Sequence, residues 1–240
     1  MKIECVQICV NYSDFLATTL VHNKYIFDKI VVVTSDKDKD TADVCEYFHI
    51  QCVKTNIFEK EFNKGKAINL GLSHLDRDGW VVHMDGDIVL PPRARYLFEI
   101  AKPREDTLYG INRVMCPSYE AWLEFVAKPV LSHGCDIYIH QNQFPMGTAI
   151  GKLTKHPNDP SDLGWIPLGF FQMWYEGGKE KRTYSESHKD FARSDMDFAY
   201  QWARDRRALI PEVIGIHLQT DDASKMGINW SGRATKRFGP

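Results

Sequence analysis

The chain has 240 residues, with 30 lysines and arginines against 32 aspartates and glutamates, so its formal net charge is −2. Hydrophobic residues make up 43% and charged residues 26%, which excludes a disordered chain, a collagen-like chain and a coiled coil. The balanced charge excludes a polycation that coats nucleic acid, although it leaves room for a local basic patch.

Six cysteines are present, and none forms a C-x-x-C pair. They are typical of free buried thiols in a reducing compartment. No apolar run approaches the roughly 18 residues that a membrane span needs, and the N-terminus lacks a secretory signal pattern. These features predict a soluble, cytoplasmic protein without a membrane span.

Strand-like and helix-like segments alternate through the first half of the chain. Taken in order, the patterns predict a strand at 3–10, a helix at 15–20, a strand at 30–34, a helix at 41–48, a strand at 50–54, a helix at 66–75, a strand at 80–84, a helix at 93–101 and a strand at 107–114. This order predicts a mostly parallel sheet with helices on both faces. Ligands of such sheets bind beyond the carboxyl ends of the strands.

The second half is less regular. Residues 142–164 are rich in Pro, Gly, Asn and Asp, which predicts a long loop. The polar segment 177–189 fits either a lid or an ordinary solvated loop. Ser194 can cap a helix that runs to residue 202, and residues 209–218 are typical of a final strand. Residues 219–240 form a tail without apolar periodicity.

The sequence Asp85-Gly86-Asp87 follows the predicted buried strand at 80–84. Two carboxylates one residue apart on a turn can converge on one hard cation, Mg²⁺ or Mn²⁺, and the glycine lets the backbone approach a phosphate. An acidic solvated turn is the alternative. Upstream, residues 63–69 (NKGKAIN) place lysines and a glycine at a helix start, where free N–H groups favour an anion or where the lysines are simply solvated.

Four stretches occur in one order along the chain: KGKAINLGL at 64–72, HMDGDIVLP at 83–91, SDMDFAYQW at 194–202 and GIHL at 215–218. Together they resemble nucleotide-sugar-dependent glycosyltransferases of the GT-A fold, in the family-2-like and galactosyltransferase-like branches. The resemblance implies a Rossmann-like α/β catalytic domain at 1–218. A nucleotide-sugar-binding half would cover 1–114, an irregular acceptor-side half 115–218, and the tail 219–240 would close on the active site.

The same resemblance implies roles for individual residues. Asp87 would be the main ligand of Mn²⁺ or Mg²⁺, Asp85 would touch both metal and sugar-nucleotide, and His217 would be the third protein ligand. Relatives carry the catalytic base in a Glu-Asp pair, whereas this chain has Asp195 and Asp197 two residues apart; Asp195 is the implied base and Asp197 the next choice. The residues implied to bind the sugar-nucleotide are Val10, Asn11, Tyr12, Ser35, Asp36, Lys66 and Asp85.

Sugar transfer explains why these residue types belong together. A divalent cation neutralises the leaving diphosphate, and a carboxylate on the opposite side of the sugar takes the proton of the attacking hydroxyl. We therefore expect a metal-dependent glycosyltransferase with a soluble acceptor, which could be a saccharide, a protein or modified nucleic acid. With Asp195 as the base the transfer would invert the sugar's configuration, while the spacing of the residues does not exclude a retaining course. A nucleotidyltransferase and a non-catalytic sugar- or nucleotide-binding module are the alternatives.

Overall fold

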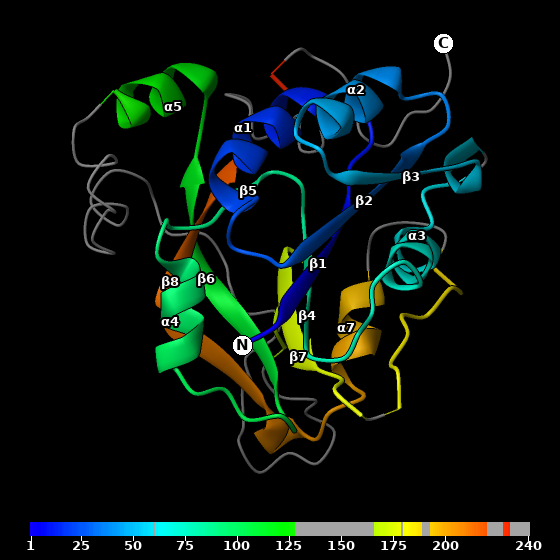
Figure 1. Cartoon of the computed structure of the whole chain (residues 1–240), viewed down its shortest axis with the longest axis vertical. Coiled ribbons are helices and arrows are strands. Elements are labelled where there is room, and N and C mark those ends of the chain that lie inside the picture. Colours follow the sequence, from blue (N-terminus) through cyan, green and yellow to red (C-terminus); the bar gives the residue numbers. More distant parts are fainter. Residues whose placement is uncertain (60, 128–165, 179, 189–192, 220–227, 231–240) are drawn as a thin grey trace.

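The computed structural model describes residues 1–59, 61–127, 166–178, 180–188, 193–219 and 228–230. These residues form an eight-stranded sheet in the order β3-β2-β1-β4-β7-β6-β8-β5 (Figure 1). The strands are β1 (Ile3–Ile8), β2 (Lys29–Ser35), β3 (Gln51–Thr55), β4 (Trp80–Met84), β5 (Ile88–Val89), β6 (Leu108–Cys116), β7 (Phe171–Tyr175) and β8 (Arg207–Leu218). The helices are α1 (Ser13–Asn23), α2 (Lys39–Tyr47), α3 (Lys64–Leu72), α4 (Ala94–Ile100), α5 (Tyr119–Val126) and α7 (Ser194–Ala199), with short 3₁₀ helices at Ile57–Glu59 and Arg204–Arg206.

The predicted mostly parallel α/β sheet is confirmed. β3, β2, β1 and β4 run in parallel, and so do β6 and β8. β7 lies between β4 and β6 and is antiparallel to both, while β5 pairs antiparallel with β8. As a result, the carboxyl end of β4 lies beside the first residue of β7, with Met84 paired to Phe171.

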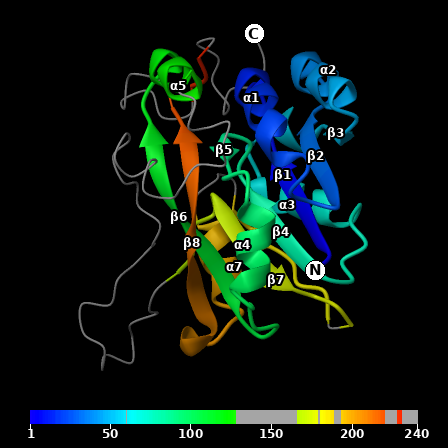
Figure 2. The ribbon, with the colours of Figure 1, turned by 60° about the vertical axis from the view of Figure 1, so that its left-hand side comes forward.

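Two apolar layers cover the sheet, because neighbouring strand residues point to opposite faces. One layer joins Cys5, Val32 and Val82 to α1, α2 and α4 through residues such as Leu16 and Phe98. The other layer packs the alternate strand positions against α3 and α7 (Figure 2). This second layer holds α7, and therefore Asp195, close to the carboxyl end of β4.

Several local expectations differ from the structure. The predicted helix at 66–75 begins at Lys64, because the side chain of Asn63 caps it by accepting from the N–H of Lys66 at 2.9 Å. Ser194 is not the N-cap of α7: Arg193 takes that position with φ +74°, and the Ser194 hydroxyl is buried without a partner. Helix α5 is not predicted. The loop predicted at 142–164 and most of the tail 219–240 lie outside the described residues.

Residues 180–188 are strapped onto the α3 and α7 face of the sheet. Tyr184 is only 2% exposed, stacks on Phe198 at 3.8 Å between ring centroids, and donates its hydroxyl to Gln172 Oε1 at 2.6 Å. The side chain of Asn69 bonds both the N–H and the carbonyl of Tyr184. The described part of the 177–189 segment is therefore anchored to the sheet through Tyr184, while most of its other side chains are exposed.

A buried ion pair holds the start of this strap. Arg77 binds Glu176 through two nitrogens at 2.5 and 2.6 Å, and Glu176 also accepts the N–H of Arg182 at 2.8 Å.

We expect Glu176→Gln to lower the free energy of unfolding by about 3 kcal/mol, because it leaves the buried Arg77 guanidinium without its counter-charge. Urea denaturation measures this effect. Glu99→Gln is the matched control, since Glu99 makes exposed ion pairs and its loss should cost less than about 1 kcal/mol. Equal losses in the two variants would contradict the prediction.

Candidate active site

The Asp85-Gly86-Asp87 turn is anchored at the carboxyl end of β4. The N–H of Asp85 donates to the carbonyl of Phe170 at 3.0 Å, just before β7. From α1, the Thr19 hydroxyl donates to the carbonyl of Gly86 at 2.8 Å, and the Asn23 amide donates to that of Ile88 at 2.7 Å. Because Thr19 and Asn23 are fully buried, these bonds fix the backbone of the turn and hence the directions of both carboxylates.

Asp87 faces His217 across the sheet. Ile88 of β5 pairs with His217 of β8, which brings Nε2 of the ring to 3.2 Å from Asp87 Oδ2. The other oxygen, Oδ1, is buried and has no hydrogen-bond partner. Burial alone would raise the pKa of Asp87, but the charge and hydrogen bond of His217, together with Lys64, hold this pKa below its usual value. Asp87 is therefore an ionised carboxylate with one unused oxygen.

Asp85 turns away from this pair and toward α3. Its Oδ1 accepts from Lys64 Nζ at 2.6 Å, and burial raises the pKa of Asp85 in spite of that ammonium group. The same Nζ lies 3.5 Å from the carbonyl of Gly169, whose N–H donates to Asp195 Oδ2 at 2.7 Å. Lys64 and Gly169 thus connect the Asp85 carboxylate to Asp195.

The two candidate bases on α7 have different surroundings. Asp195 lies against Gly169, and its carbonyl accepts from the buried amide of Gln172 at 3.0 Å. Asp197 instead pairs with His188 Nε2 at 2.5 Å, on the strap. Residues two apart on a helix point in directions about 200° apart. The structure therefore brings Asp195, and not Asp197, to the Lys64–Asp85 contact.

Most of the other predicted sugar-nucleotide residues gather where β1 and β2 end. Val10 and Ser35 are buried, and Asp36 is exposed directly after β2. Asn11 has φ +59° and donates its N–H to Asp38 Oδ2 at 2.7 Å, while Tyr12 precedes α1. Burial and the nearby Asp87 carboxylate raise the pKa of Tyr12, so its hydroxyl stays protonated.

Lys66 is exposed, and the lysine that reaches Asp85 is Lys64, at the first position of α3. Sequence reasoning also missed Asp38, which precedes α2 and accepts hydrogen bonds from Asn11 after β1, from Thr34 of β2 and from Thr41 of α2. Its signal was available, because an aspartate before a helix is a common N-cap. Arg113, which contacts His217 from β6, gave no comparable signal.

The residues present fit a divalent cation in part. Among the described residues, no three His, Cys, Asp or Glu side chains are already grouped to hold a metal ion, so the predicted three-ligand set is not assembled. Asp87 and His217 are close enough to share a cation, and the unused Oδ1 of Asp87 is an oxygen ligand of the kind that Mg²⁺ and Mn²⁺ prefer. The other positions of such a cation would fall to water and to a phosphate-bearing ligand.

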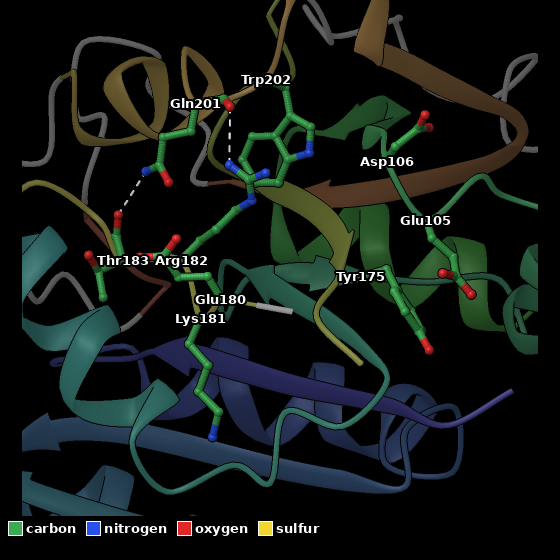
Figure 3. A pocket seen from close by; sticks show the side chains of 9 residues that line it. All are labelled: Glu105, Asp106, Tyr175, Glu180, Lys181, Arg182, Thr183, Gln201 and Trp202. Atoms are coloured by element: carbon green, nitrogen blue, oxygen red, sulfur yellow. Dashed lines mark hydrogen bonds between the residues drawn. The ribbon is translucent and has the colours of Figure 1, made fainter. Parts of the chain in front are cut away.

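A separate cavity of about 470 Å³ opens near the amino end of β4, at the other end of this strand from the acidic turn (Figure 3). Its walls include Tyr175 and Trp202, and the guanidinium of Arg182 lies 4.0 Å above the Trp202 ring. Tyr175 pairs with Trp80, the first residue of β4, which lies five residues or roughly 17 Å along the chain from Asp85. The cavity is therefore distinct from the acidic turn.

The sheet, the crossing strand β7 and the acidic turn together define a GT-A-type fold. Three solved structures share this fold. Glucosyl-3-phosphoglycerate synthase from Mycobacterium tuberculosis, in complex with Mn²⁺, uridine diphosphate and glucosyl-3-phosphoglycerate, has a TM-score of 0.51 at 15% identity over 91% of this chain and 70% of that one. Its complex with Mn²⁺, uridine-diphosphate-glucose and phosphoglyceric acid gives 0.54 at 13% identity over 94% and 74%. A structure described only as a mycobacterial protein gives 0.55 at 14% identity over 94% and 70%.

The family model for glycosyl transferase family 2 matches residues 6–141, more than half of the chain. The chain belongs to glycosyltransferase family 2 and is a glycosyltransferase. No curated protein sequence matches it. In the part of the chain that the structure describes, none of the helices has the length and apolar character needed to cross a bilayer.

Proposed function

We propose that this glycosyltransferase uses a divalent cation to transfer a sugar, with inversion, from a nucleotide-diphosphate sugar to an acceptor hydroxyl. The observation that carries this proposal is the grouping at one end of β4. The Asp87–His217 pair lies on one side of the turn, and the Lys64–Gly169–Asp195 connection lies on the other. Membership of glycosyltransferase family 2 argues against the two alternatives, a nucleotidyltransferase and a non-catalytic binding module.

Each of these residues has a separate role in the proposed reaction. Asp87 and His217 would hold the cation, which supplies positive charge to the leaving diphosphate. Lys64 adds a second positive charge beside the turn, held by Asp85 at 2.6 Å. Asp195 is the proposed base that takes the proton of the acceptor hydroxyl. Its Oδ2 is fixed by the Gly169 N–H, and this bond orients the carboxylate before the acceptor binds.

The nucleotide is proposed to bind where β1 and β2 end. Asn11, Tyr12 and Asp36 border this region, and Asp38 fixes the Asn11 backbone. The C-terminal part of the chain also reaches it, because Asn229 donates its side-chain amide to the carbonyl of Asn11 at 2.7 Å. Trp230 packs edge-on against Phe15 at 4.7 Å. These contacts support the proposal that the tail closes on the sugar-nucleotide site.

Removing the metal tests the donor half of the proposal. We expect hydrolysis of at least one nucleotide-sugar with Mn²⁺, and a drop to background when a chelator is added, because the leaving diphosphate then loses its counter-charge. A panel of uridine, guanosine, adenosine and thymidine diphosphate sugars, assayed by release of nucleoside diphosphate, measures this. Restoration of turnover by added Mn²⁺ controls for damage by the chelator. Turnover of no donor, together with no binding of nucleotide with Mn²⁺, would refute the proposal.

The acceptor is proposed to be a soluble molecule: a saccharide, a protein or modified nucleic acid. Representatives of these classes can be tested against the donor that hydrolyses fastest. Phosphoglyceric acid belongs in the same panel, since a solved structure with this fold contains it. A true acceptor should speed the release of nucleoside diphosphate and yield a glycosylated product by mass spectrometry.

A further inference from the structure

Arg113 contacts the proposed metal ligand His217. It lies on β6 opposite Gly215 of β8, and its Nη1 is 2.8 Å from Nδ1 of the His217 ring. The guanidinium is half-buried and rests 4.3 Å above the Phe170 ring. Its Nε is buried without a hydrogen-bond partner. Arg113 therefore places an incompletely satisfied positive group beside the Asp85–Asp87 turn.

The contact fixes which ring nitrogen carries the proton. A guanidinium can only donate hydrogen bonds, so Nδ1 of His217 must accept. The proton of a neutral ring then lies on Nε2, which points at Asp87 Oδ2 at 3.2 Å. The ring can offer the Nε2 lone pair to a cation only after it loses that proton and gains one on Nδ1 from solvent. The Nδ1–H and the Arg113 N–H would then oppose each other. Arg113 and a divalent cation are thus alternative partners of His217.

The charges around Arg113 support the same conclusion. The Arg113 guanidinium interacts electrostatically with the carboxylates of both Asp87 and Asp85. A divalent cation bound at Asp87 would add positive charge beside this guanidinium, and the negative charge of a diphosphate ester would offset it. An arginine released from His217 is well suited to such an anion, because its planar fork matches phosphate oxygens.

We propose that Arg113 is a positioning residue that competes with the divalent cation for His217 and, once released, binds the donor's diphosphate. This inference rests on the proposed function. It couples the two ligands: the cation displaces Arg113, and the displaced guanidinium strengthens binding of the nucleotide. Cation and nucleotide should therefore bind together much more tightly than either binds alone.

Two substitutions with opposite hydrogen-bonding properties test the competition. In Arg113→Gln the side-chain oxygen can accept from Nδ1–H and so permits the cation-binding form of the ring. In Arg113→Lys the side chain can only donate. Calorimetric titration of the full-length protein with Mn²⁺ alone should show about tenfold tighter binding for Arg113→Gln and little change for Arg113→Lys. Uridine diphosphate titrated at saturating Mn²⁺ should bind about tenfold more weakly to Arg113→Gln.

Arg206→Met is the matched control, since Arg206 lies at the opposite end of β8 from His217 and pairs with Asp106. It should leave both affinities unchanged. A general loss of structure would weaken both ligands, so opposite changes for Mn²⁺ and uridine diphosphate are specific to the proposal. Changes of the same sign, or no change, in an Arg113→Gln protein with normal circular dichroism would overturn it. If the unmodified protein binds neither ligand, the proposed function itself is wrong.

Discussion

Replacing Asp87 with alanine should abolish sugar transfer while leaving the protein folded. Asp87 is the ionised carboxylate that faces His217 and has an unused buried oxygen. Its loss removes an anionic cation ligand, and we expect donor turnover at saturating Mn²⁺ to fall at least about a thousandfold. Initial rates of nucleoside diphosphate release measure the effect, and circular dichroism with urea denaturation reports on the fold.

Asp78→Ala is the matched control for this variant. Asp78 lies just before β4, at the opposite end of the strand from Asp87, and makes an exposed ion pair with Lys2. Its removal should leave turnover within about twofold of the unmodified protein. Full activity of Asp87→Ala would contradict the metal assignment. Equal loss in both variants would show instead that turnover depends on the stability of this strand.

Replacing Asp195 with asparagine should lower kcat by about a hundredfold to ten-thousandfold, the range expected for loss of a general base. The amide keeps an oxygen that can accept from the Gly169 N–H, so the local backbone should remain in place. Because the substitution leaves Asp87 and His217 intact, Mn²⁺ and uridine diphosphate should bind within about threefold of their normal affinities. Steady-state kinetics and calorimetry separate these effects.

Asp197→Asn tests the rival assignment on the same helix. It alters the hydrogen bond with His188 but leaves the Asp195–Gly169 contact unchanged, so kcat should change by less than about tenfold. A large loss in Asp197→Asn with normal kcat in Asp195→Asn would reverse the roles of the two aspartates. The stereochemistry of the product tests inversion independently.

The sequence was informative wherever burial and periodicity act locally. The apolar run at β4 predicts both the strand and the place of Asp85 and Asp87, because a buried strand ends where charged residues begin. The same reasoning predicts most of the parallel strands. The direction of a strand is harder to predict. The aromatic run that forms β7 has the same apolar pattern whichever way it runs, so only the structure shows that β7 lies antiparallel between β4 and β6.

Which of two neighbouring lysines meets the turn depends on the first residue of a helix. The Asn63 cap starts α3 at Lys64, and the 200° between positions 64 and 66 then points one lysine at Asp85 and leaves the other exposed. The position of Arg113 relative to His217 depends on the register of two paired strands. The pairing of β6 with β8 shifts between Ile111 and Asn112, and this irregularity sets the register in which Arg113 meets His217. A single sequence does not reveal such a shift.

The reversed direction of β7 has a consequence for how this chain can vary. The first residue of β7 is paired to the last residue of β4. The pairing register of these two strands therefore sets the spacing between the Asp85 carboxylate and the Gly169–Asp195 contact. A slip of one residue would turn every β7 side chain to the other face of the sheet. Length changes within residues 169–175 should therefore be incompatible with catalysis.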